Sequence, residues 1–277
     1  MKQILVYLFI INSISSYPVA IIHGFYDSCS NTFFTTLKKV LKYNNKNYAY
    51  CLNSGEGSES LSLSFEEQCQ RACDEINQNS EFDKDFSILS ISQGGLIARY
   101  LIQKCEMKGK VKKLVSFGGP MMGTSQVPFC LGGVSCFIIN SIADYFVYYN
   151  YFQKNVGPAG YYKTAAHNKD FESSNSFLYN LNNPKNETEK QNFIDLESLV
   201  LIGFKKDKMI SPKESAEFGK FDENFKVQRM NETEEYLNDN FGLRTLDENK
   251  KIQIHYLEGE HIEFDYNDVL KYAIPNL

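Results

Sequence analysis

A serine flanked by small residues carries the strongest chemical signal in this sequence. Residues 86–91 alternate apolar and small side chains as a strand does, Ser92-Gln93-Gly94-Gly95 follows, and an apolar helical pattern begins at once. This order is typical of a nucleophile elbow, a sharp strand-to-helix turn that exposes a serine hydroxyl above a sheet edge. Ser90 stands where the G-x-S-x-G pattern has its first glycine, and serine is small enough for that position. The sequence therefore predicts Ser92 as a nucleophile.

A serine hydroxyl becomes a nucleophile when a neighbouring base takes its proton, and that base needs an acid to orient it. His261 follows the predicted last strand, 251–257, and Asp207 follows a predicted strand at 199–204. The chain order Ser, Asp, His on loops after successive strands is the order of the α/β hydrolases. We therefore predict His261 as the base and Asp207 as the acid.

The chain has four histidines, and the other three fit the base less well. His255 alternates within a predicted strand, and His167 lies in a polar connection. His23 ends the first predicted strand, where a structural role or a place in an oxyanion loop suits it better. Asp195 and Asp247 remain alternatives for the acid.

An oxyanion hole needs two backbone N–H groups aimed at the developing negative charge. One is expected from Gln93, directly after the nucleophile at a helix N-terminus, and the other from Phe25, since Gly24 lets the first loop turn inward. These are backbone roles.

Glu258, Glu260 and Glu263 near two histidines lack the spacing of a known metal motif, so we expect neither a metal nor a cofactor.

Strands and helices alternate through the first part of the chain, which predicts a mostly parallel central sheet with helices on both faces. From 121 to about 193 this pattern is interrupted by an aromatic-rich stretch of short helices and loops, predicted as a helical cap inserted into one α/β domain, 17–277. The expected strands are 19–22, 48–52, 86–91, 111–117, 199–204 and 251–257, and the expected helices include 32–41, 65–76 and 265–273.

The chain of 277 residues has a net charge of −5 and shows no basic cluster, which argues against a nucleic-acid partner. Residues 1–16 read as a secretory signal peptide, with Lys2 before the apolar run 4–11 and small residues at 13–15. The apolar run is far shorter than the ~20 residues that span a bilayer, and we expect no membrane segment in the mature chain.

Secretion permits disulfides, and the seven cysteines suit an oxidising compartment. Their places on the predicted strands, loops and helices suggest three pairs as hypotheses, Cys29–Cys51, Cys73–Cys105 and Cys130–Cys136, and leave Cys69 without a partner. Asn186 and Asn231 begin glycosylation sequons in polar surroundings, as expected for surface loops of a secreted glycoprotein.

Several ordered motifs together resemble the palmitoyl-protein thioesterases, which are lysosomal α/β hydrolases. The resemblance runs from about Pro18 to the C-terminus. The matching segments are His23-Gly24-x-x-Asp27-Ser28-Cys29, Ser92-Gln93-Gly94-Gly95, Ser116 to Gly123, Pro158 to Lys163, Asp207 with Pro212, Glu217-Phe218-Gly219, Phe241 to Asp247 and Glu258 to His261. The family's nucleophile, acid and base fall on Ser92, Asp207 and His261. Cys73 with Cys105, and Cys130 with Cys136, stand where the family's disulfides would be.

The resemblance implies hydrolysis of long-chain fatty acyl thioesters on S-acylated cysteines of proteins or peptides, with a place in the secretory pathway, the lysosome first and the extracellular space as an alternative. The aromatic residues of the cap fit either of two roles, lining the apolar groove that an acyl chain needs or packing the cap's own core. Two other functions stay open from the residues alone: a lipase or carboxylesterase acting on oxygen esters, and a catalytically inactive lipid-binding relative.

Overall fold

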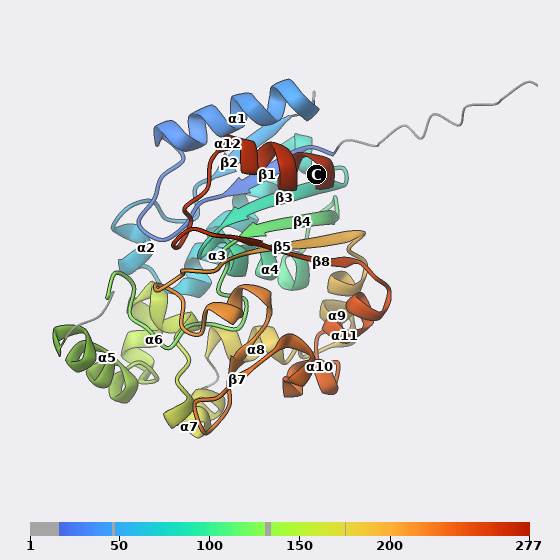
Figure 1. The fold of residues 1–277 in the computed structure, drawn as a ribbon. Helices are drawn as coiled ribbons and strands as arrows, with labels where there is room; N and C mark the ends of the chain where they lie inside the picture. Colours follow the sequence, from blue (N-terminus) through green and yellow to red (C-terminus); the bar gives the residue numbers. More distant parts are fainter. Residues whose placement is uncertain (1–16, 46–47, 131–133, 175) are drawn as a thin grey trace, which may run out of the picture.

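The computed structural model describes residues 17–45, 48–130, 134–174 and 176–277, so the predicted signal peptide, 1–16, lies outside the described residues. A six-stranded sheet with the strand order β2-β1-β3-β4-β5-β8 forms its centre (Figure 1), and every neighbouring pair is parallel. The strands are β1 Val19–Ile22, β2 Ala49–Leu52, β3 Phe86–Ile91, β4 Val111–Phe117, β5 Ser198–Phe204 and β8 Ile252–Leu257. The predicted fold class, an α/β-hydrolase fold, is confirmed.

Helices cover both faces of this sheet. Figure 1 shows α1 and the C-terminal α12 on one face and α3 and α4 on the other. The helices are α1 Thr32–Asn45, α2 Glu59–Ser62, α3 Phe65–Gln78, α4 Gly94–Lys104, α5 Val134–Phe146, α6 Asn150–Asn155, α7 Asn168–Ser173, α8 Phe177–Asn182, α9 Glu187–Ile194, α10 Glu234–Leu237, α11 Leu243–Glu248 and α12 Tyr266–Asp268. A short antiparallel hairpin, β6 Lys220–Phe221 with β7 Val227–Gln228, follows β5.

The inner strands β1, β3 and β5 are mostly apolar because both of their faces are buried. In β1, Val19 and Ile21 pack in a core with α1, whereas Ala20 and Ile22 pack in a second core with α3 and α4. Each fully buried isoleucine of this kind contributes about 1.5–3 kcal/mol. The sheet is thereby held rigidly, and its carboxyl edge can position side chains.

The stretch between β4 and β5, called the helical segment below, contains the helices α5 to α9. Of these, α5 to α8 group on the side of the sheet away from α1 and α12 (Figure 1). A tight 3₁₀ turn, Gly157–Tyr161, anchors this helical segment to α3. A Cβ on Gly160 would lie 2.6 Å from Cβ of Phe65, so only glycine permits this approach.

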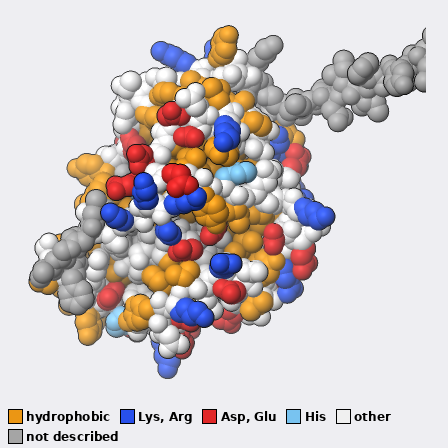
Figure 2. Space-filling view, viewed as in Figure 1, with side chains coloured by type: hydrophobic (Ala, Val, Ile, Leu, Met, Phe, Trp, Pro, Cys, Tyr) orange, Lys and Arg blue, Asp and Glu red, His pale blue; other side chains and the backbone are white. Residues whose placement is uncertain are grey.

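Two predicted disulfides, Cys29–Cys51 and Cys73–Cys105, are present. Cys130 is disulfide-bonded, but the side chain of its predicted partner, Cys136 on α5, lies outside the described part of the structure, so the pair Cys130–Cys136 stays a prediction. Cys69 is a buried free thiol. Within the described part of the chain, no helix has the length and apolarity to cross a membrane. Acidic and basic side chains are interspersed on the face shown in Figure 2.

Candidate active site

The predicted elbow is formed where β3 ends at Ile91 and α4 begins at Gly94. Ser92 has a φ of 51°, in the left-handed region that a serine seldom occupies. A Cβ on Gly94 would lie 2.6 Å from the backbone oxygen of Ile22, so the first strand leaves no room for a side chain there. The strained turn and the close neighbouring strand together present the Ser92 hydroxyl at the sheet edge.

Ser90 occupies the glycine position of the elbow pattern without distorting the turn. Its side chain is completely buried, and its hydroxyl lies 3.5 Å from the backbone oxygen of Val115 on β4. The departure from G-x-S-x-G is therefore accommodated by the small space between β3 and β4.

Two hydrogen bonds join the three residues predicted as nucleophile, base and acid. Ser92 Oγ lies 2.8 Å from Nε2 of His261, and Nδ1 of His261 lies 2.6 Å from Oδ2 of Asp207. In the neutral imidazole, Nδ1–H donates to the carboxylate and Nε2 accepts the serine hydroxyl. The imidazole is thus oriented to take the proton of Ser92.

Backbone groups fix the carboxylate of Asp207. Its Oδ1 accepts the N–H groups of Met209, at 2.8 Å, and Ile210, at 3.0 Å. The side chains of Asp207 and His261 are only 1% and 6% exposed, so their hydrogen bond is shielded from water. Shielding of this kind strengthens the interaction and keeps one rotamer.

Each of the three side chains follows a different strand of the sheet. Ser92 comes after β3, Asp207 after β5 and His261 after β8. Because parallel strands end at the same edge, residues far apart in sequence meet there, at the carboxyl edge where open α/β sheets bind their ligands.

The two expected oxyanion donors flank Ser92. Gly24 packs against the serine, since a Cβ built on Gly24 would lie 3.1 Å from Cβ of Ser92. Among the described residues, neither the N–H of Phe25 nor that of Gln93 donates a hydrogen bond to another protein group. Both donors remain available to a substrate oxygen.

The other candidates for the acid and the base have partners of their own outside the line from Ser92 to Asp207. Asp195 pairs with Lys110, and Asp247 accepts a hydrogen bond from the Tyr236 hydroxyl. His255 is half-buried on β8 against Tyr272, and His167 pairs with Asp170. His23 is buried beside the elbow with Nδ1 on the backbone oxygen of Gly24.

One group of metal-ligating residue types comes together in the described ranges: His23, Cys29 and Glu56. The sulfur of Cys29 is bonded to Cys51 and is not free to ligate. Glu258 pairs with Lys205, and Glu263 accepts the backbone N–H of Glu260. The acidic residues near His261 are therefore engaged within the protein.

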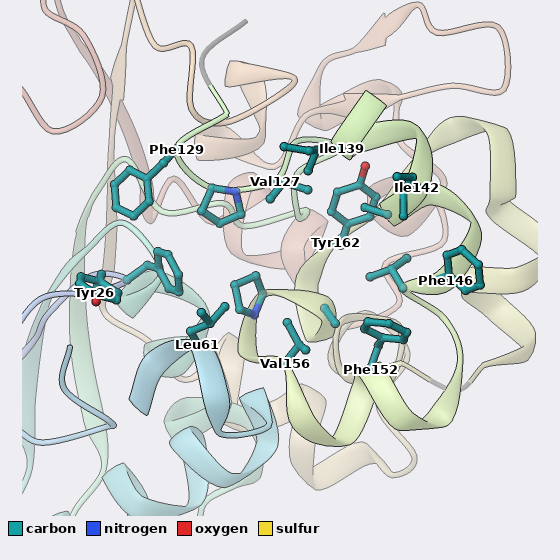
Figure 3. A pocket seen from close by; sticks show the side chains of 16 residues that line it. Tyr26, Leu61, Val127, Phe129, Ile139, Ile142, Phe146, Phe152, Val156 and Tyr162 are labelled. Atoms are coloured by element: carbon teal, nitrogen blue, oxygen red, sulfur yellow. The ribbon is translucent and has the colours of Figure 1, made fainter. Parts of the chain in front are cut away.

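A cavity of about 650 Å³ opens near the loop that follows β1 (Figure 3). Its lining is entirely uncharged and almost entirely apolar, from the loop after β1, from α2 and from the helical segment; the residues include Phe25, Leu61, Phe129, Ile142, Phe146 and Val156. Phe25 belongs to this lining, and Gly24, the residue before it, packs against Ser92, so the loop after β1 connects the cavity with the serine. Its volume lies within the range typical of small-molecule sites.

The side chain of Gln93 has two buried partners that the sequence analysis did not predict. Its Nε2 donates to Oε1 of Gln68, at 2.8 Å, and its Oε1 accepts the Tyr161 hydroxyl, at 2.9 Å. The partners are 25 and 68 residues away in sequence, so no local sequence pattern predicts these contacts. Tyr161 does lie in the matching segment from Pro158 to Lys163, the one signal that pointed to it.

Comparison with known proteins gives a consistent similarity. The family model "Palmitoyl protein thioesterase" matches residues 18–261. The chain is 29% identical over 276 residues to Palmitoyl-protein thioesterase 1 of Caenorhabditis elegans, covering 94% of this chain and 92% of the relative. It is 29% identical over 254 residues to Lysosomal thioesterase PPT2-B of Xenopus laevis, covering 90% and 87%. Among solved structures, a monoacylglycerol lipase of Paleococcus ferrophilus is similar at 12% identity, with a TM-score of 0.45 and coverage of 90% and 89%.

Proposed function

This chain belongs to the palmitoyl protein thioesterase family and is a thioester hydrolase, and on that premise we propose that it cleaves long-chain fatty acyl thioesters, palmitoyl among them, from S-acylated cysteines of proteins or peptides. The observation that carries the proposal is the line of hydrogen bonds from Ser92 through His261 to Asp207, together with an apolar cavity of about 650 Å³ that is lined in part by the loop packed against Ser92.

The proposed reaction begins with attack of Ser92 Oγ on the thioester carbonyl carbon while Nε2 of His261 takes the hydroxyl proton. Asp207 stabilises the imidazolium, and the N–H groups of Phe25 and Gln93 receive the carbonyl oxygen as it becomes an oxyanion. Collapse of the tetrahedral intermediate breaks the C–S bond, and His261 returns the proton to the departing thiolate. An ester between Ser92 and the fatty acid remains.

The second half of the proposed reaction repeats these roles with water. His261 takes a proton from the water that attacks the acyl ester, and the intermediate collapses to free fatty acid and the Ser92 hydroxyl, which recovers the proton. Every step uses side chains and backbone groups of this chain, and the mechanism needs no cofactor.

The cavity supplies the proposed selectivity for long chains. Each buried methylene contributes about 0.8 kcal/mol, so a chain that enters the cavity gains affinity with length. The lining offers no charge to a fatty acyl group.

The proposed location is the secretory pathway, with the lysosome as destination. Two observations support it: a relative carries "lysosomal thioesterase" in its name, and both sequon asparagines, Asn186 and Asn231, lie on the exposed surface. Removal of N-linked glycans should increase the electrophoretic mobility of the protein purified from its source, and a single Asn231→Gln or Asn186→Gln change should each remove part of that shift. Protein with unchanged mobility would contradict passage through the glycosylating compartments.

The test of the proposed function is hydrolysis of a palmitoyl thioester beside its matched oxygen ester. We expect turnover of the thioester by the wild type and none by Ser92→Ala, with Ser90→Ala, two residues earlier on the same strand, as the matched control that keeps activity. Preference for the oxygen ester would favour the lipase alternative. Failure of Ser92 to react with a serine-directed fluorophosphonate would favour the inactive lipid-binding alternative.

A further inference from the structure

A chain of buried hydrogen bonds joins the two loops that carry the proposed oxyanion donors. Nε2 of Gln93 donates to Oε1 of Gln68 at 2.8 Å, and Nε2 of Gln68 donates to the backbone oxygen of Ser60 at 2.9 Å. The hydroxyl oxygen of Ser60 accepts the backbone N–H of Tyr26 at 2.8 Å. Both Ser60 and Gln68 are completely buried. Two side chains thus link Gln93 to the residue next to Phe25.

Both loops are strained at the point where this link holds them. Ser92, which precedes Gln93, has a φ of 51°, and Tyr26, which follows Phe25, has a φ of 60°. Residues other than glycine keep such left-handed conformations only where surrounding contacts impose them. The hydrogen bonds from Gln68 and Ser60 are contacts of this kind, one for each loop.

The link is also closely packed and fully paired. Nε2 of Gln68 donates a second hydrogen bond to the backbone oxygen of Leu63 at 3.1 Å, and the Tyr161 hydroxyl donates to Oε1 of Gln93 at 2.9 Å. A Cβ on Gly157 would lie 2.4 Å from Nε2 of Gln68, so the helical segment closes over the amide. A paired and enclosed network of this sort holds one arrangement.

We infer that Ser60 and Gln68 are positioning residues, which hold the N–H groups of Phe25 and Gln93 where a developing oxyanion needs them. The inference rests on the proposed function, since it concerns the same Ser92 reaction. Donors stabilise a transition state in proportion to how well they are placed beforehand, and small displacements lower the rate markedly. Neither the Ser60 nor the Gln68 side chain lines the cavity.

The first test compares Gln68→Met and Ser60→Ala with matched exposed controls, Gln70→Met on the same helix and Ser62→Ala on α2. Hydrolysis of a short-chain acyl thioester is measured per active site, counted by the end point of fluorophosphonate labelling. We expect kcat to fall about tenfold in Ser60→Ala and about ten- to a hundredfold in Gln68→Met, with KM within about threefold of wild type, because an oxyanion donor acts on the transition state. The controls should keep wild-type kcat.

The second test uses two inhibitors. A fatty acyl trifluoromethyl ketone forms a tetrahedral oxyanion on the serine, so its affinity should fall by the same factor as kcat/KM, while inhibition by the free fatty acid stays unchanged. A merely structural role would lower the melting temperature and the number of titrated sites but leave both per-site values alone. Per-site kcat within twofold of wild type in both variants would overturn the inference.

Failure of the inference is distinguishable from failure of the proposed function. A short acyl group reports on the oxyanion donors whatever chain length the enzyme prefers. Lack of palmitoyl turnover would appear in the wild type, whereas misplaced donors appear only as a difference between the variants and their controls.

Discussion

The carboxyl edge of the sheet carries Ser92, and the helical segment between β4 and β5 contacts the next residue, Gln93, through the Tyr161 hydroxyl. The two regions differ in character. At the sheet edge, three polar side chains are joined by hydrogen bonds of 2.8 and 2.6 Å and are largely hidden from water. The helical segment supplies most of an uncharged cavity and leaves large apolar side chains such as Ile142 and Tyr145 exposed. The sheet edge depends on the positions of individual polar atoms, whereas the helical segment mainly provides apolar space.

Because of this difference, the two regions should tolerate amino-acid substitutions to different degrees. A hydrogen-bonded proton path fails when one atom is replaced, because geometry and protonation state both matter. An apolar cavity keeps its character through many substitutions and changes mainly in the length of chain that it holds. Changes at the sheet edge should therefore affect the rate for every substrate, and changes in the helical segment should affect long substrates most.

The largest effect is expected from Asp207→Asn. Because Oδ1 accepts the backbone N–H groups of Met209 and Ile210, the asparagine oxygen should stay there and its NH₂ should face Nδ1 of His261. That contact favours the wrong imidazole tautomer, and we expect kcat to fall about 10³- to 10⁴-fold for short and long thioesters alike. Steady-state kinetics of the folded variant measure this.

The matched controls for that prediction are Asp195→Asn and Asp247→Asn, the two alternatives for the acid. Both side chains pair elsewhere, with Lys110 and Tyr236, and neither change should lower kcat by more than about twofold. A large loss in either control, with activity kept in Asp207→Asn, would assign the acid to another strand end.

The next effect should separate the two regions. Ala143 lines the cavity, and Ala143→Phe would fill space needed by about three or four methylenes, each contributing about 0.8 kcal/mol. We expect kcat/KM to fall on the order of a hundredfold for a palmitoyl thioester and by less than about threefold for a butyryl thioester.

The exposed Ala166→Phe, a change of the same size outside the cavity lining, is the control for Ala143→Phe. Ala166→Phe should leave kcat/KM unchanged for both the palmitoyl and the butyryl thioester. Equal losses for both chain lengths in Ala143→Phe would mean that the cavity does not hold the acyl chain.

The same contrast explains what could be predicted from the sequence. All six strands of the central sheet were predicted, the inner ones as apolar runs that are buried on both faces and β8 as an alternating run, and Ser92, Asp207 and His261 were predicted because each follows one of these strands. The predicted helix at 265–273 is only partly α-helical: a π turn, Val269–Ala273, follows α12, and Pro275 prevents a longer helix.

For the helical segment, the sequence predicted an aromatic-rich insertion from its composition but not which side chains face the cavity. Aromatic residues marked it, but Phe146, Phe152 and Tyr162 line the cavity, Tyr149 is exposed, and Tyr161 binds Gln93. Helices of six residues are too short for their periodicity to reveal which face is buried. The four-residue α2, which carries Ser60, was missed for the same reason.

The smallest effect concerns how the helical segment is held to the rest of the protein. Glu235 is buried between Lys220 of β6, at 2.6 Å, and Lys163 of the helical segment, at 3.8 Å. Burial alone would raise the pKa of the Glu235 carboxyl, but the two ammonium groups more than offset this and hold the pKa below its usual range. Burial lowers the pKa of Lys163 to about 8, so that ammonium group remains charged in neutral and acidic solution.

A carboxyl whose pKa is depressed by folding adds stability above its unfolded pKa, and this stability is lost as the pH falls through the folded pKa. We expect Glu235→Gln to lower the free energy of unfolding by about 2 kcal/mol at pH 7, because it leaves two buried ammonium groups without their partner. The difference from wild type should persist at pH 5 and shrink below the usual carboxyl range. Denaturant unfolding at several pH values measures it, with exposed Glu234→Gln as control. A stability difference that stays constant down to pH 3 would mean that Glu235 acts through packing. A difference that shrinks only below the usual carboxyl range would mean that Glu235 holds the two regions together electrostatically, and that this interaction persists at the pH of an acidic compartment.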